Sequence, residues 1–110
     1  MQYWGGRCPL TGIADSELLR ASHIVGWAEC DDDAHRLDVH NGFLLSALWD
    51  AAFDKGLVSF GDDGTVLASP RPSSDSREAL CLATTLFLLG LTEAHRANLA
   101  RHRERFEPFI

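Results

Sequence analysis

The sequence predicts an α+β fold, because strand-like and helix-like stretches alternate along its 110 residues. Two short apolar runs, the latter part of 18–24 and 42–45, have the character of strands. A helical stretch follows the second run, and a Gly-Asp-Asp-Gly turn between two further apolar runs indicates a β-hairpin. In order, we expect strands in the latter part of 18–24 and at 42–45, a helix at 47–55, a hairpin of 57–60 with 65–68, and helices at 76–89 and 92–105.

The composition is that of an ordinary globular domain, with 45% hydrophobic and 24% charged residues. A chain of 110 residues is long enough to bury one core. We therefore expect a single domain over 1–110, with a core at about 8–68 and a helical extension at about 73–106, within a longer protein.

The cysteines and the apolar segments indicate a cytoplasmic protein without a membrane partner. The chain has three cysteines and no CxxC pair, which argues against a zinc site of the usual spacing and against a complete disulfide framework. Reduced thiols are typical of the cytosol. The N-terminus lacks the pattern of a signal peptide. The uncharged run 79–91 is shorter than a membrane span and is expected to form a buried helix, with an oligomer surface as the alternative.

The formal net charge of −6 counts against nucleic-acid binding, because nucleic-acid-binding domains usually carry a basic surface. The distribution of the charges leaves such binding open. The acidic triplet Asp31, Asp32 and Asp33 is confined to one loop. The arginines crowd the C-terminus, at Arg96, Arg101, Arg103 and Arg105.

Residues 25–40 show neither a strand nor a helix period and are predicted to be a loop, anchored by Trp27 and Leu37. A loop of about this length within a compact domain is often functional. His23 ends the apolar run before it, and Asn41 opens the run after it.

The helix at 47–55 has start and stop signals at both ends. Ser46 is a suitable N-cap, and Gly56 suits the residue just beyond the C-terminus. The side chains expected on its buried side are Leu48, Ala51, Ala52 and Phe53.

His23, Asp50 and Asp54 are candidates for phosphodiester chemistry. Cleaving a phosphodiester needs a base for the attacking water and positive charge on the phosphate and the leaving oxygen. A histidine of ordinary pKa, ~6.5, is a natural base at neutral pH. Carboxylates at positions i and i+4 of one helix share a face and can hold one hard divalent ion.

The ordered motifs resemble those of the HNH endonucleases, in particular the branch found in restriction-like bacterial proteins. The matching pieces span roughly 8–68, with looser similarity at 102–106. They are Cys-Pro-Leu-Thr-Gly at 8–12, Leu-Arg-Ala-Ser-His-Ile at 19–24, Asn-Gly-Phe-Leu-Leu at 41–45 and Phe-Asp-Lys-Gly-Leu-Val-Ser-Phe at 53–60. The resemblance implies a ββα unit that binds one divalent metal ion.

The resemblance also implies roles for single residues. His23 would be the general base, and Asn41 a structural asparagine that holds the histidine in place. The family's third letter, a helical histidine nine residues after the asparagine, is Asp50 in this chain. Asp54 lies where relatives such as the colicin nucleases carry another metal ligand. The implied metal ligands are therefore Asp50 and Asp54.

Two features depart from the family pattern. Many relatives place an Asp or His just before the base, whereas this chain has Ser22, a poor ligand for Mg²⁺. The CxxC pairs that bind zinc in other branches are absent. Replacing His by Asp favours a harder ion, so one Mg²⁺ or Mn²⁺ ion is expected.

The resemblance implies a metal-dependent DNA endonuclease, with a role in restriction or phage defence. Because the domain is acidic, we expect target recognition to involve another domain, a partner or a homodimer. A catalytically inactive HNH scaffold that serves binding or assembly is the alternative, and a toxin-like RNase is a third reading.

Structural roles are also open for each candidate residue. His23 could be a hydrogen-bonded structural residue, Asn41 a turn residue and Asp50 an exposed helix residue. Asp54 could pair with Lys55 or Arg36.

Overall fold

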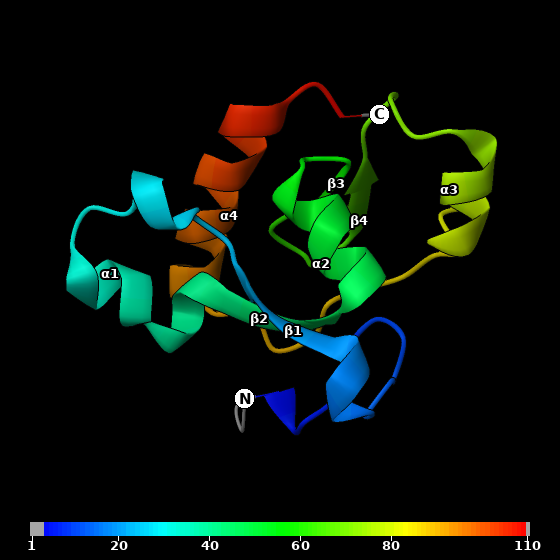
Figure 1. The fold of residues 1–110 in the computed structure, drawn as a ribbon. Coiled ribbons are helices and arrows are strands. Elements are labelled where there is room, and N and C mark those ends of the chain that lie inside the picture. The colour runs from blue at the N-terminus through cyan, green and yellow to red at the C-terminus, as the bar shows by residue number, and fades with distance from the viewer. Residues whose placement is uncertain (1–3, 110) are drawn as a thin grey trace.

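The computed structural model describes residues 4–109, and the predicted α+β class is confirmed. Strands and helices follow one another along the chain (Figure 1). The strands are β1 (Leu19–His23), β2 (Gly42–Ser46), β3 (Val58–Phe60) and β4 (Val66–Ala68). The helices are α1 (Asp33–Leu37), α2 (Ala47–Asp54), α3 (Ser74–Ala79) and α4 (Glu93–Phe106). Short 3-10 turns lie at Ser16–Leu18, Trp27–Glu29 and Val39–Asn41.

β1 and β2 form an antiparallel pair whose register places His23 opposite Gly42 and Leu19 opposite Ser46. The end of β2 leads directly into α2, which packs across the pair (Figure 1). Two strands followed by a helix form a ββα unit, with His23 at the end of β1 that adjoins the long connection 24–41.

An aromatic core joins this unit to the second hairpin, β3–β4. Phe43 of β2 lies 5.7 Å from the ring centroids of both Phe53 and Phe60. Trp49 stacks on Phe60 at 6.4 Å. The expected burial of Ala52 and Phe53 is confirmed, but that of Leu48 and Ala51 is wrong. α2 turns Trp49 inward instead, because this larger ring covers more of the core than the leucine would.

The predicted ends of α2 are confirmed. Ser46 caps the helix, with its Oγ accepting from the Trp49 N–H at 3.5 Å. Gly56 follows the helix with a φ of 71°, a conformation that glycine adopts without steric cost. A side chain at this position would collide with the Phe106 ring, so Gly56 also allows α4 to approach α2.

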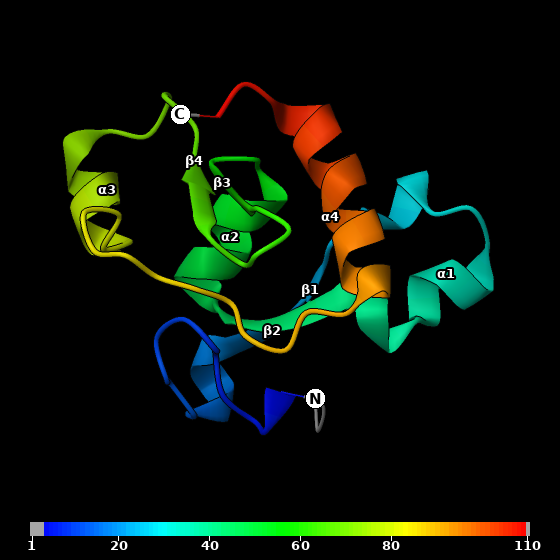
Figure 2. The same cartoon turned by 180° about the vertical axis from the view of Figure 1, so that it is seen from behind.

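The predicted helix at 76–89 is wrong beyond Ala79, where α3 ends. The chain then turns at 80–83 and continues toward α4 without a helix (Figure 2). A bridge between Thr65 and Phe87 joins this segment to the second hairpin. The Leu88 N–H donates to the Gly64 carbonyl at 2.9 Å, and Leu88 is buried while Leu89 is 79% exposed. Alternation of burial is a strand pattern, so the expected buried helix at 79–91 is also wrong.

The predicted loop 25–40 is wrong in part, because it holds α1 and two 3-10 turns. Its acidic residues serve as helix caps. Asp32 accepts from the His35 N–H at 2.8 Å, and Asp38 accepts from the His40 N–H at 2.9 Å. The Asp triplet therefore marks a helix start.

α4 lies beside α2 on the side opposite α3, and both views agree on this arrangement (Figures 1 and 2). Its predicted start is confirmed, since Thr92 caps the helix by accepting from the His95 N–H at 3.3 Å. Among the helices described between residues 4 and 109, none is long and apolar enough to cross a membrane.

Candidate active site

His23 lies exposed at the end of β1, and its ring is oriented by a backbone carbonyl of α1. Nε2 lies 3.2 Å from the Arg36 carbonyl oxygen. A carbonyl oxygen only accepts, so in this contact Nε2 carries the proton and donates it. In the neutral ring, Nδ1 then carries the lone pair and is the nitrogen able to accept a proton.

Asn41 is buried and ties together the two ends of the connection 24–41. Its Oδ1 accepts from the Val25 N–H at 2.7 Å, and its Nδ2 donates to the Val25 carbonyl at 3.2 Å. Nδ2 also lies 3.4 Å from the His35 carbonyl oxygen. The Asn41 carbonyl accepts from the Ile24 N–H at 3.1 Å. Asn41 thus contacts the chain just after His23 and just before Arg36, the residues at the two ends of the His23 hydrogen bond.

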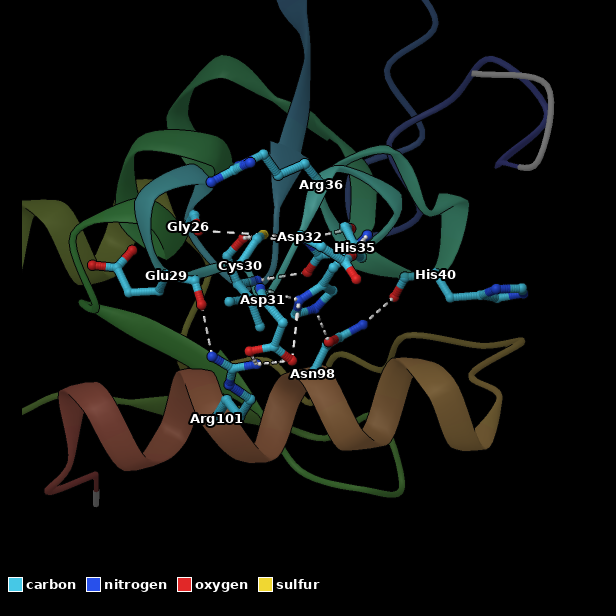
Figure 3. A network of polar contacts seen from close by, with 12 residues as sticks. Gly26, Glu29, Cys30, Asp31, Asp32, His35, Arg36, His40, Asn98 and Arg101 are labelled. Atoms are coloured by element: carbon cyan, nitrogen blue, oxygen red, sulfur yellow. Dashed lines mark hydrogen bonds and ion pairs between the residues drawn. The ribbon is translucent and has the colours of Figure 1, made fainter.

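α4 supports the same segment from outside through Asn98 (Figure 3). His35 donates from Nε2 to the Asn98 Oδ1 at 2.8 Å, since its Nδ1 accepts from the Asp31 N–H at 3.1 Å. The Asn98 Nδ2 donates to the His40 carbonyl at 3.0 Å. One side chain of α4 therefore contacts the segment both within α1 and just beyond its C-terminal end.

Two of the arginines of α4, Arg101 and Arg105, contact the same segment, and Figure 3 shows Arg101. Arg101 donates to the Glu29 carbonyl at 2.7 Å and pairs with Asp31 at 3.3 Å. Arg105 pairs with the Glu29 carboxylate at 3.1 Å. Arg101 and Arg105 are therefore paired with carboxylates of this segment, whereas Arg103 pairs with Asp62 in the turn of the second hairpin.

Asp50 and Asp54 lie one turn apart on α2, next to its buried side. Asp50 is half-buried and has no hydrogen bond or ion pair with the described part of the chain. Asp54 is exposed and lies 3.6 Å from the Lys55 Nζ. No hydrogen bond or ion pair joins His23 to either carboxylate within residues 4–109. His23 and Asn41 are thus linked indirectly, through their contacts with neighbouring backbone groups of the connection 24–41. Asp50 and Asp54 form a separate pair on α2.

Comparison with known families identifies this arrangement. The family model for HNH endonucleases matches residues 8–61. This segment belongs to the HNH endonuclease family. The match contains β1, β2 and α2, which form the ββα core, and it leaves β4, α3 and α4 outside. No curated protein matches the chain.

The HNH assignment indicates a nuclease-type function with a nucleic-acid substrate. HNH nucleases generally use a divalent metal ion, and the fit of such an ion depends on the side chains that the core can offer as ligands. Within residues 4–109, no group of three His, Cys, Asp or Glu side chains gathers as a metal cluster. Mg²⁺, however, is commonly held by one or two carboxylates, with water and substrate phosphate as the other ligands. The pair Asp50 and Asp54 meets that lower requirement.

Ser22 adds a second observation at the HNH core. Its side chain is 3% exposed, and its Oγ is buried without a hydrogen-bond partner in the described structure. Residues opposite each other in an antiparallel pair share a face, so Ser22 shares its face with Phe43, which packs on Phe53 of α2. Ser22 Oγ is therefore a buried hydroxyl without a partner on the core face of the strand pair, which is uncommon in a folded protein.

His102 is a buried histidine whose contacts give it a structural role. Its Nε2 donates to the Phe53 carbonyl at 2.8 Å, and its Nδ1 accepts from the Ser59 hydroxyl at 2.7 Å. Its ring stacks on Phe53 with centroids 3.9 Å apart. Burial lowers the pKa of His102 to about 4, so the ring is neutral at physiological pH.

Sequence reasoning missed the contributions of α4 to the HNH domain. The buried polar residues of α4 are His95, Asn98 and His102, and they share one face with Leu99. Spacings of three, four and seven residues mark one side of a helix, which is a readable signal. Nothing in the sequence indicates that Asn98 contacts His35 and His40, more than fifty residues earlier.

Proposed function

We propose that this HNH domain hydrolyses phosphodiester bonds in DNA with His23 as the general base. The observation that carries the proposal is the hydrogen bond from His23 Nε2 to the Arg36 carbonyl, which leaves Nδ1 as the proton acceptor. The exposure of His23 supports it, because a substrate phosphate and a water molecule can reach the ring.

In the proposed reaction, His23 Nδ1 takes a proton from the attacking water. The water oxygen forms a bond to phosphorus, and the bond from phosphorus to the 3′ oxygen breaks. The products end in a 5′-phosphate and a 3′-hydroxyl, the latter taking its proton from solvent. The Arg36 carbonyl stabilises the protonated ring, because Nε2 donates to it throughout.

Asn41 acts in this proposal as a positioning residue. It does not touch the substrate, and it fixes Val25 and the His35 carbonyl on the two sides of the His23–Arg36 contact. Without Asn41, the segment that carries His23 and the segment that carries Arg36 could move independently of each other.

Asp50 and Asp54 would hold one Mg²⁺ or Mn²⁺ ion, with water and the substrate phosphate as the remaining ligands. When bound, such an ion neutralises negative charge on the phosphate and on the leaving oxygen. The net charge of −6 makes this neutralisation important, because the overall charge of the domain does not attract a polyanion.

A non-catalytic HNH scaffold is the second candidate function. The serine at position 22, the absence of a three-ligand cluster within residues 4–109 and the acidic charge favour it. Such a module would keep the fold for binding or assembly, and it would not depend on divalent ions.

The melting temperature and the cleavage of nucleic acid, each measured with and without Mn²⁺, distinguish the nuclease from the non-catalytic scaffold. We expect millimolar Mn²⁺ to raise the melting temperature of the wild type, and Asp50→Ala and Asp54→Ala to remove that rise. Asp75→Ala, an exposed carboxylate on α3, is the control and should keep it. In parallel, DNA and RNA are offered to the wild type side by side. We expect it to cleave the DNA in the presence of Mn²⁺ and not in the presence of EDTA.

Each other outcome selects a different function. If Mn²⁺ does not stabilise the wild type and the wild type does not cleave DNA or RNA, the scaffold role is established. Cleavage of RNA alone would replace the DNA endonuclease by a ribonuclease.

A further inference from the structure

Trp27 is a large aromatic side chain that lies exposed beside the proposed base. Its side chain is 57% exposed, so the sequence-based expectation that Trp27 anchors the loop by packing is wrong. Its ring centroid lies 5.6 Å from that of His23, with the two planes at 87°. The indole therefore contributes little to the core and presents much of its apolar surface to solvent at the catalytic position.

The orientation of this indole is fixed by Arg36. The Arg36 Nε donates to the Trp27 carbonyl at 2.9 Å, and its Cζ lies 5.4 Å from the centroid of the indole ring. The guanidinium is held in turn by Asp33 at 2.7 Å. Because Arg36 also accepts the His23 hydrogen bond, Trp27 and His23 are held by the same residue. A ring held in this way loses little freedom when a ligand binds.

We propose that Trp27 stacks on an unpaired nucleobase of the DNA strand whose phosphodiester is presented to His23. The inference rests on the proposed function of His23 and adds the substrate contact next to it. Aromatic side chains bind single-stranded nucleic acid by stacking, since every base has a π-face. Bases inside a duplex are already stacked on each other, so the ligand is single-stranded or locally melted DNA.

Stacking also suits the charge of this domain. A protein of net charge −6 gains little from general attraction to phosphate, and the arginines at 36, 101 and 105 are already paired with carboxylates. Base stacking does not depend on net positive charge and is only weakly screened by salt. Trp27 therefore supplies a kind of affinity that the electrostatics of the domain do not.

The test is a titration of the full chain with a short single-stranded DNA in a buffer that contains EDTA. Intrinsic tryptophan fluorescence is the readout of binding. Binding should quench the wild type, and Trp27→Phe should lose that quenching although Trp4 and the buried Trp49 remain. Trp27→Ala should raise the dissociation constant roughly 5- to 150-fold, which corresponds to ~1–3 kcal/mol per stacked base. Trp27→Phe, which keeps an aromatic ring, should recover most of the affinity.

Leu37→Ala is the matched control, because Leu37 is an apolar side chain of the same segment that is 77% exposed. It should bind like the wild type. A blunt duplex of the same sequence should quench much less than the single strand.

The proposal is overturned if single-stranded DNA does not bind, or binds without quenching. Unchanged affinity in Trp27→Ala, or equal quenching by duplex, would overturn it as well. Reduced cleavage by Trp27→Ala with unchanged affinity would assign Trp27 to positioning His23. Cleavage that needs His23, together with absent quenching, would leave the proposed function standing and remove only the stacking.

Discussion

At the scale of single residues, Asn41 and His23 differ in how strongly their surroundings specify them. Asn41 is fully buried, and both ends of its amide are paired with backbone groups of Val25. Burying an amide is favourable only when such partners are present. His23 is exposed and has a single hydrogen bond, so little in the fold requires a histidine there. This contrast suits the proposed roles of Asn41 as a structural residue and of His23 as the general base.

Asn41→Ala should therefore damage stability as well as activity. It leaves the Val25 N–H without its acceptor in a buried site, and we expect a loss of about 2–4 kcal/mol in the free energy of unfolding. Urea denaturation of wild type and variant measures it. Asn98→Ala is the comparison, because it loses contacts that are only partly buried and should cost less. Equal losses in the two variants would contradict the role given to Asn41.

At the scale of elements, α4 holds the HNH core together although it lies outside the family match. Its first half contacts the segment 25–40 through Asn98, and its second half contacts α2 and β3 through His102. Because the ring of His102 is buried and stacks on Phe53, burial disfavours its charged form, and the contact is made by the neutral imidazole. The docking of α4 is thus coupled to pH.

Acid should weaken this contact over a defined range. The pKa of His102 falls from 6.5 to about 4 on folding, so the unfolded chain binds the extra proton first and stability is lost as the pH falls from 6.5 toward 4. His102→Gln should be less stable than the wild type at pH 7.5, and the gap should narrow by about 2–3 kcal/mol at pH 4.5. Urea denaturation at the two pH values measures the gap. A constant gap would show that His102 does not titrate in this way.

At the scale of the whole molecule, the sequence predicted the parts whose signals are local. The caps at Ser46 and Gly56 and the turn at 61–64 specify backbone geometry within a few residues, and they were confirmed. The segment 79–91 was misread because its uncharged composition suits a buried helix and an edge segment equally. Its pairing with Thr65 through Phe87 is a long-range contact that composition does not encode.

The candidate site also has features that could be predicted from the sequence and features that could not. The positions of His23 and Asn41 around one connection could be predicted, since His23 ends β1 and Asn41 directly precedes β2. The Arg36 carbonyl that orients His23 could not be, because it depends on where α1 folds. The exposure of Trp27 was also hidden from the sequence, since tryptophan is usually well buried.

The central claim is that His23 is the general base, and cleavage of supercoiled plasmid tests it most directly. Wild type, His23→Ala and His40→Ala would be compared with Mn²⁺ and with EDTA, after matching their folded fractions. We predict Mn²⁺-dependent nicking by the wild type and by His40→Ala, and a loss of about 100-fold or more in His23→Ala. Nicking by His23→Ala at the rate of the wild type would contradict the claim.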